Sequence, residues 1–193
     1  MKAQENHLTI AIAGQPNVGK STIFNYLTGG TQYVSNWPGK TSCCQTATIT
    51  HRGEKIRVVD LPGVYSLSSG SLEEEMVRKY LVEDRPDAVL VILDAVSIER
   101  NLYLVAELLC LPIPLVIAIN RMDLAESQGV RIEPPILEAA LRVPVVPLVA
   151  QRGEGVEQAL TSAIQLARNP ANFLPNHPLI RPDHQEVLDQ LEE

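Results

Sequence analysis

The chain has 193 residues, which is room for one domain of ordinary size and at most a short appendage. It is 45% hydrophobic, so it can bury a core. Its formal net charge of −7 argues against binding of the chain as a whole to nucleic acid or to an anionic membrane by charge attraction. Three cysteines, two of them adjacent and none in C-x-x-C spacing, argue against a disulfide framework or a structural zinc site and predict a reducing compartment.

The first half of the chain predicts strands joined by short loops and helices. Arg52-Gly53-Glu54 lies between two β-branched segments, and the central glycine favours a hairpin. The elements expected here are a strand at Leu8–Ala13, a helix at Thr22–Leu27, strands at Thr46–His51 and Lys55–Asp60, and a helix at Leu72–Glu83.

The second half alternates apolar runs with helical patterns, which is typical of a parallel sheet with crossover helices. We expect strands at Asp87–Asp94, Pro114–Asn120 and Val143–Val149, and helices at Ile98–Cys110, Glu133–Leu141 and Val156–Arg168. The predicted fold class is α/β: a mostly parallel sheet flanked by helices, with an antiparallel hairpin. Ligands of such sheets bind beyond the carboxyl ends of the strands.

The composition changes after Arg168. Four prolines between Asn169 and Pro182 exclude a regular helix there, and a helical pattern resumes at Asp183. We therefore expect a domain at residues 1–168, and at 169–193 a proline-rich linker with the start of a truncated helical region. The opening residues lack a signal peptide, and no apolar run is long enough to span a membrane.

The segment GQPNVGKS matches the phosphate-loop pattern G-x-x-x-x-G-K-[ST], and it lies between a predicted strand and a predicted helix. Its backbone N–H groups and the helix N-terminus are suited to phosphate oxygens. Lys20 is expected to reach the β- and γ-phosphates, and the Ser21 hydroxyl to coordinate Mg²⁺. The expected nucleotide-binding set here is Gly14, Gln15, Pro16, Asn17, Val18, Gly19, Lys20, Ser21 and Thr22.

A carboxylate and a glycine follow the second strand of the predicted hairpin, in the sequence Asp60-Leu61-Pro62-Gly63. Asp60 is placed to hold Mg²⁺ through water, because this ion keeps part of its hydration shell. Gly63 has no side chain, so its N–H can approach a γ-phosphate.

A base-recognition loop is predicted at Asn120, Arg121, Met122 and Asp123, after a buried strand. The Asp123 carboxylate can accept hydrogen bonds from guanine N1–H and its 2-amino group, donors that adenine lacks, and this discriminates strongly between the bases. Asn120 is expected to tie this loop to the phosphate loop. After the next strand come Val149, Ala150 and Gln151, and a backbone N–H of this segment is expected to bind guanine O6.

These motifs, in this order, resemble the G1, G3, G4 and G5 elements of small GTPases. Four further segments resemble the FeoB ferrous-iron transporters: VSNWPGKT at 34–41, LPGVYSL at 61–67, ERNLYL at 99–104 and VPLVAQRGEG at 146–155. The resemblance covers residues 8–168. The chain departs from the usual pattern at two places. Val-Ala-Gln replaces the common Ser-Ala-Lys of G5, which predicts loose guanine binding. Arg121 stands where the family often has an apolar residue, and we expect it to be an exposed loop arginine.

The resemblance implies a GTPase that regulates ferrous-iron transport across the bacterial inner membrane, with this part in the cytoplasm and a helical domain and a membrane permease following it. Thr41 would be the G2 threonine, which adds its hydroxyl to Mg²⁺ when GTP is bound. Asn17 resembles the asparagine by which potassium-activated GTPases bind K⁺ beside the phosphates. Lys20, Thr41, Gly63 and Asn17 would then act in catalysis, and intrinsic turnover would be slow because Val64 stands where Ras-type proteins have a glutamine.

Three other functions stay open at this point. A P-loop kinase would prefer adenine, which Asp123 disfavours. A soluble Era-like ribosome-assembly GTPase would need an RNA-binding appendage. A binding module that reads GTP against GDP would show little turnover. Self-association of the chain is also left open. Cys43 and Cys44 are not predicted to bind iron, because adjacent side chains on a strand point to opposite faces.

Overall fold

The computed structural model describes residues 7–29, 35–36, 44–68 and 70–177. Their strands form one seven-stranded sheet in the order β2-β3-β4-β1-β5-β6-β7. The strands are β1 (Leu8–Gly14), β2 (Ser35–Asn36), β3 (Gln45–His51), β4 (Glu54–Asp60), β5 (Ala88–Asp94), β6 (Leu115–Asn120) and β7 (Val145–Pro147).

Four neighbouring strand pairs run parallel, and the two pairs that include β3 run antiparallel. Asp60 at the end of β4 pairs with Ile12 of β1, and Asp94 at the end of β5 pairs with Asn120 at the end of β6. The carboxyl ends of the parallel strands therefore meet at one edge of the sheet.

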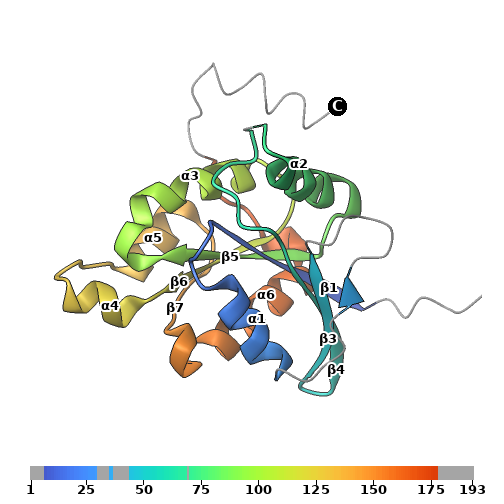
Figure 1. Cartoon of the computed structure of the whole chain (residues 1–193), viewed down its shortest axis with the longest axis horizontal. Helices are drawn as coiled ribbons and strands as arrows, with labels where there is room; N and C mark the ends of the chain where they lie inside the picture. Colours follow the sequence, from blue (N-terminus) through green and yellow to red (C-terminus); the bar gives the residue numbers. More distant parts are fainter. Residues whose placement is uncertain (1–6, 30–34, 37–43, 69, 178–193) are drawn as a thin grey trace, which may run out of the picture.

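Helices cover both faces of the sheet (Figure 1). Ile10 and Ile12 of β1 face a hydrophobic cluster that includes side chains of α1 and α6, whereas Ala11 and Ala13 face a cluster that includes α2 and α3. This is the alternation that a strand imposes on its side chains. The helices are α1 (Lys20–Thr28), α2 (Leu72–Lys79), α3 (Ile98–Leu109), α4 (Met122–Ser127), α5 (Pro134–Leu141) and α6 (Val156–Arg168).

The predicted α/β architecture is confirmed, including the hairpin of β3 and β4, but three elements differ from the prediction. The helix expected at Leu72–Glu83 is α-helical only to Lys79 and continues as a π-helical turn at Tyr80–Asp84, which ends before Pro86. The strand expected at Val143–Val149 is only the short β7. The short, largely exposed helix α4 was not predicted.

Among the described residues, none of the helices is long and apolar enough to cross a membrane.

Candidate functional site

The phosphate loop lies between β1 and α1, at the edge where the parallel strands end. Gly19 precedes α1 with φ of +103°, a left-handed conformation that favours glycine. A Cβ on Gly19 would lie 2.3 Å from Nδ2 of Asn120, so only a residue without a side chain allows this approach. The loop is thus shaped by its own glycine and by a side chain from the end of β6.

Lys20 and Asp60 form the buried charged centre of this edge. Lys20 is only 8% exposed, and its Nζ donates to the Gln15 carbonyl oxygen at 3.0 Å. Burial lowers the pKa of Lys20, and the nearby Asp60 charge opposes that shift. Burial likewise raises the pKa of Asp60, against the effects of Lys20 and of a hydrogen bond from Ser21.

The oxygens of Asp60 and Ser21 fit a magnesium ion. Ser21 Oγ donates to Asp60 Oδ2 at 3.2 Å, while Asp60 Oδ1 is buried with no hydrogen-bond partner among the described residues. Burying a carboxylate oxygen without a partner is costly, and a hard cation is the partner that an all-oxygen donor set suits. Thr41, the third expected magnesium ligand, lies outside the described residues.

Gly63 follows β4 and packs closely against the phosphate loop. A Cβ at this position would lie 2.9 Å from Lys20 Nζ and 2.9 Å from Pro16 Cα. Next to it, the Val64 N–H donates to the Gly14 carbonyl oxygen at 3.3 Å, and the Val64 side chain is buried. The segment after β4 is therefore seated directly on the phosphate loop, with no room for a side chain at Gly63.

Asn120 joins three segments of the site, and its predicted tie to the phosphate loop is confirmed. Its Nδ2 donates to the Val18 carbonyl oxygen at 2.8 Å, and its Oδ1 accepts hydrogen bonds from the backbone N–H groups of Arg121 at 2.8 Å and Ala150 at 3.0 Å. The last bond was not predicted, and it connects the base loop to the Val149–Gln151 segment, from which a backbone N–H is expected to bind guanine O6.

Asp123 lies in the first turn of α4 with its carboxylate partly exposed. Its Oδ1 accepts from the Leu124 N–H at 2.9 Å, and its Oδ2 lies 3.3 Å from Nη2 of Arg152. Arg152 follows Gln151 in the short 3₁₀ turn at Ala150–Arg152. An arginine of the second predicted base-binding segment thus contacts the carboxylate of the first.

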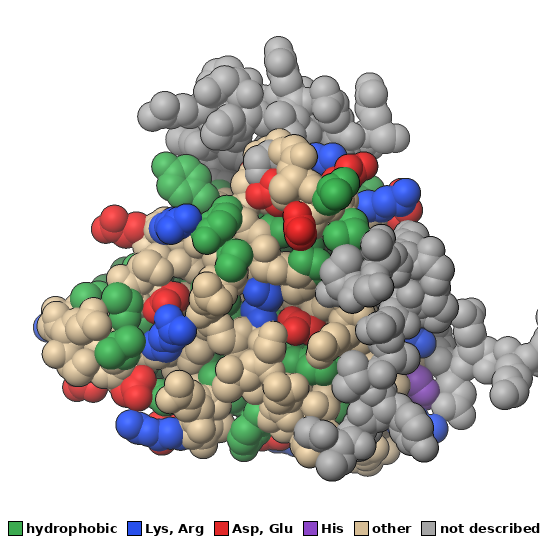
Figure 2. All heavy atoms as spheres, viewed as in Figure 1, with side chains coloured by type: hydrophobic (Ala, Val, Ile, Leu, Met, Phe, Trp, Pro, Cys, Tyr) green, Lys and Arg blue, Asp and Glu red, His purple; other side chains and the backbone are tan. Residues whose placement is uncertain are grey.

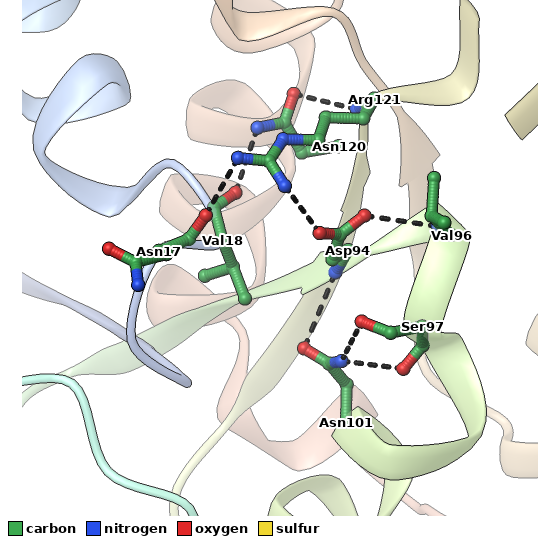
Figure 3. A network of polar contacts seen from close by, with 8 residues as sticks. All are labelled: Asn17, Val18, Asp94, Val96, Ser97, Asn101, Asn120 and Arg121. Atoms are coloured by element: carbon green, nitrogen blue, oxygen red, sulfur yellow. Dashed lines mark hydrogen bonds and ion pairs between the residues drawn. The ribbon is translucent and has the colours of Figure 1, made fainter. Parts of the chain in front are cut away.

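The Arg121 side chain is 42% exposed, in agreement with the exposed loop arginine that the sequence predicts, but it is also engaged in two polar contacts. Its Nη1 lies 2.6 Å from Oδ2 of Asp94, and its Nη2 donates to the Asn17 carbonyl oxygen at 2.9 Å (Figure 3). The sequence did not predict these contacts, because the partners lie 27 and 104 residues away along the chain. Asp94 was missed as a site residue, although an acidic residue closing an apolar strand beside Asn120 was a usable signal.

The remaining predicted residues lie around this edge. Asn17 and Thr22 are exposed, Val18 is buried, and Met122 begins α4 and packs partly buried against the core. Val149 is held by a hydrogen bond from its N–H to the Glu154 carbonyl oxygen at 3.0 Å. The structure therefore brings the described predicted residues of all four motifs to one edge of the sheet.

The space-filling view shows acidic and basic side chains intermixed over this face, with a basic and an acidic group side by side near its middle (Figure 2). Among the described residues there is no group of three His, Cys, Asp or Glu side chains that could hold a metal ion. Neither sign of charge forms a continuous patch on the part of this face that the structure describes.

Comparison with known sequences identifies relatives over most of the chain. A family model described as "Ferrous iron transport protein B" matches residues 8–164. The "Fe(2+) transporter FeoB" of Escherichia coli strain K12 is 45% identical over 161 residues, which are 81% of this chain and 21% of that protein. The protein of the same name from Salmonella typhimurium is 44% identical over 169 residues, 86% of this chain and 22% of that protein. The chain thus spans about a fifth of the length of these relatives.

Solved structures agree with the sequence comparison. The FeoB G-domain from Methanococcus jannaschii is 44% identical with a TM-score of 0.74, and the match covers 84% of this chain and 98% of that one. The cytosolic domain of the T. maritima FeoB iron transporter, in a GDP form, is 34% identical with a TM-score of 0.82, and the match covers 93% of this chain and 71% of that one. Fold, motif geometry and relatives agree, and the chain belongs to the FeoB family of ferrous iron transport proteins, in which it corresponds to the G domain.

Proposed function

We propose that this chain binds GTP and hydrolyses it slowly to GDP and phosphate, with stimulation by K⁺, and thereby regulates ferrous-iron transport. The observation that carries the proposal is the meeting of the phosphate loop, Asp60, Gly63 and Asp123 at the carboxyl edge of one parallel sheet. This is the place where such sheets bind their ligands. The matched family supports the ferrous-iron assignment over an Era-like GTPase.

The residues of the edge divide the work between phosphate and base. The phosphate-loop N–H groups and the Lys20 ammonium would hold the phosphates, and Asp123 would accept the guanine donors. Ser21, Asp60 and Thr41 would hold Mg²⁺. When bound there, the ion would supply positive charge against the negative charge of the phosphate groups. Gly63 would bring its N–H to the γ-phosphate, since a side chain there would collide with Lys20.

The absence of a water-orienting side chain after Gly63 makes slow turnover the expectation. Val64 is 2% exposed and has no polar side-chain atom, so it cannot orient water as the glutamine of Ras-type proteins does. A K⁺ ion held by the exposed Asn17 amide beside the phosphates would supply positive charge. Phosphate oxygens and backbone carbonyls of residues 36–39 would complete its ligands, of which residues 37–39 lie outside the described part of the chain.

The test compares GTP hydrolysis in KCl and NaCl at equal ionic strength, with Mg²⁺ and purified protein. We expect hydrolysis to be faster in K⁺, and the difference to disappear in Asn17→Ala. Equal rates in the two salts would remove the potassium role while leaving the GTPase. Failure of the wild-type chain to bind either GTP or GDP would overturn the proposal as a whole.

We also propose that this chain is the G domain of a longer membrane protein. The matched relatives are named as Fe²⁺ transporters and are about four times as long as this chain. This supports a G domain at residues 1–168 on the cytoplasmic side of a bacterial inner membrane, acting on a membrane permease in the same protein. Residues 169–193 would lead into the next region, and the end of the family match at residue 164 and of α6 at Arg168 supports that boundary.

A further inference from the structure

We propose that Arg121, anchored by Asp94, is a positioning residue that holds the phosphate loop in its nucleotide-binding conformation. The inference rests on the proposed function for its consequence, but its physical core concerns contacts within the protein. Arg121 extends from the end of β6 to the phosphate loop, where its guanidinium bridges a carboxylate and a backbone carbonyl (Figure 3).

The carboxylate that anchors this guanidinium is itself immobilised. Asp94 Oδ1 accepts a hydrogen bond from the Val96 N–H at 3.0 Å, and the Asp94 N–H donates to Asn101 Oδ1 at 3.3 Å. Asn101 is 1% exposed, and its Nδ2 donates to the Ser97 carbonyl oxygen at 2.7 Å. Because Asp94 is already in place, its charge-assisted bond at 2.6 Å orients the guanidinium with little loss of freedom.

The guanidinium acts on a part of the phosphate loop with an unfavourable backbone conformation. Asn17 has φ of +65°, which is left-handed and uncommon for a residue with a side chain. Arg121 binds the carbonyl of Asn17, and Asn120 binds that of Val18. Two consecutive residues of the base loop thus hold two consecutive carbonyls of the phosphate loop.

Holding these carbonyls fixes the direction of the N–H groups that follow them. In a planar trans peptide the C=O and N–H bonds point in opposite directions. With the carbonyls of Asn17 and Val18 turned to the base loop, the N–H groups of Val18 and Gly19 point away from it. Figure 3 also shows the Asn17 side chain directed away from the guanidinium, so the contact between Arg121 and the Asn17 carbonyl leaves the Asn17 side-chain amide unobstructed.

The function of Arg121 is therefore to preorganise anion-binding N–H groups from a distance, without touching the nucleotide. Preorganisation lowers the cost of binding, and losing it is expressed mainly as faster dissociation. The Arg121 side chain is 42% exposed, so we expect a moderate effect: removing it should speed GDP release by roughly threefold to tenfold.

The test uses Arg121→Met and Asp94→Asn, with two readouts. Asp94→Asn keeps an oxygen for the Val96 N–H while removing the charge that binds Arg121. The first readout is amide hydrogen exchange of residues 14–19 in nucleotide-free protein, which should rise in both variants. The second is stopped-flow measurement of GDP release, which should be faster in both single variants and faster to an intermediate extent in Arg121→Lys. In the double variant the effect should be smaller than the sum of the two single effects. Arg131→Met is the control, because Arg131 lies at an exposed position, where it forms an ion pair with Glu133.

The outcomes separate this inference from the proposed function. If hydrogen exchange in residues 14–19 were unchanged in both variants, in protein of wild-type melting temperature, the proposal that Arg121 holds the phosphate loop would be overturned. Exchange that rises equally over all elements would also overturn it, since it would indicate general destabilisation. If the wild-type chain bound no guanine nucleotide, the exchange readout would still decide whether Arg121 holds the loop.

Discussion

The Glu107 carboxylate on α3 accepts a hydrogen bond from the Leu67 backbone N–H at 2.7 Å, across 40 residues of sequence. The same carboxylate accepts from Ser66 Oγ and Ser68 Oγ, each at 2.8 Å. One side chain of α3 thereby holds the segment that follows Gly63. Close by, the Arg100 guanidinium lies 4.4 Å from the centre of the Tyr65 ring.

We expect Glu107→Gln to loosen this segment, because an amide offers one acceptor oxygen where the carboxylate offers two. The free energy of unfolding should fall by about 1–2 kcal/mol, as measured by urea denaturation. Hydrogen exchange should rise at residues 64–68. Glu99→Gln, at an exposed position on the same helix, is the control and should change neither quantity. Equal exchange in the two variants would show that Glu107 does not anchor the segment.

Gly63→Ala should weaken GTP binding by about tenfold, because its Cβ would collide with Lys20 Nζ and the Pro16 backbone. Titration with a fluorescent GTP analogue measures the change. Gly70→Ala is matched to it, since a Cβ at Gly70 would meet nothing within 4 Å, and this variant should bind like the wild type. Retained affinity in Gly63→Ala would mean that the phosphate loop can shift to accommodate a methyl group.

Asp123→Asn should weaken guanine-nucleotide binding on the order of a hundredfold or more, because an amide NH₂ replaces one acceptor oxygen. The variant should gain affinity for xanthine nucleotides, in which an acceptor replaces the guanine 2-amino donor. Competition between fluorescent GDP and xanthosine diphosphate measures both changes. Glu126→Gln, exposed on the same helix, should leave both affinities unchanged. Unaltered guanine affinity in Asp123→Asn would remove Asp123 from base recognition.

Exchanging Val149 for Ser and Gln151 for Lys should slow GDP release. The lysine stem can lie over the base, and the hydroxyl can support the base-loop carboxylate; Val149 and Gln151 offer neither. Wild-type release is expected to be fast without an exchange factor, and stopped-flow fluorescence measures it. Gln158→Lys, exposed on α6, controls for the added charge. Wild-type release over many minutes would contradict the loose-binding interpretation.

Most of the fold and of the candidate site could be predicted from local sequence patterns. The glycines of the phosphate loop and the position of Asp60 at a strand end follow from short-range sequence, and the structure places them where the motifs predict. The engagement of Arg121 could not be predicted, because its partners, Asp94 and Asn17, become neighbours only when β5 and β6 pair beside β1. The hydrogen bond from the Ala150 N–H to Asn120 Oδ1 could not be predicted either, because the sequence does not show that these two groups lie within reach of each other.

The contacts that shape the phosphate loop have a consequence for folding. Val18 is bound by a residue 102 positions away, and Gln15 Nε2 donates to the Arg100 carbonyl oxygen 85 positions away. A peptide containing only β1 and α1 would lack these partners, so the loop acquires its native shape only after β5, α3 and β6 have assembled. Any ligand of the loop then recognises the folded chain and not the unfolded one. Its binding should raise the melting temperature of the whole domain with ligand concentration, rather than protect one local segment.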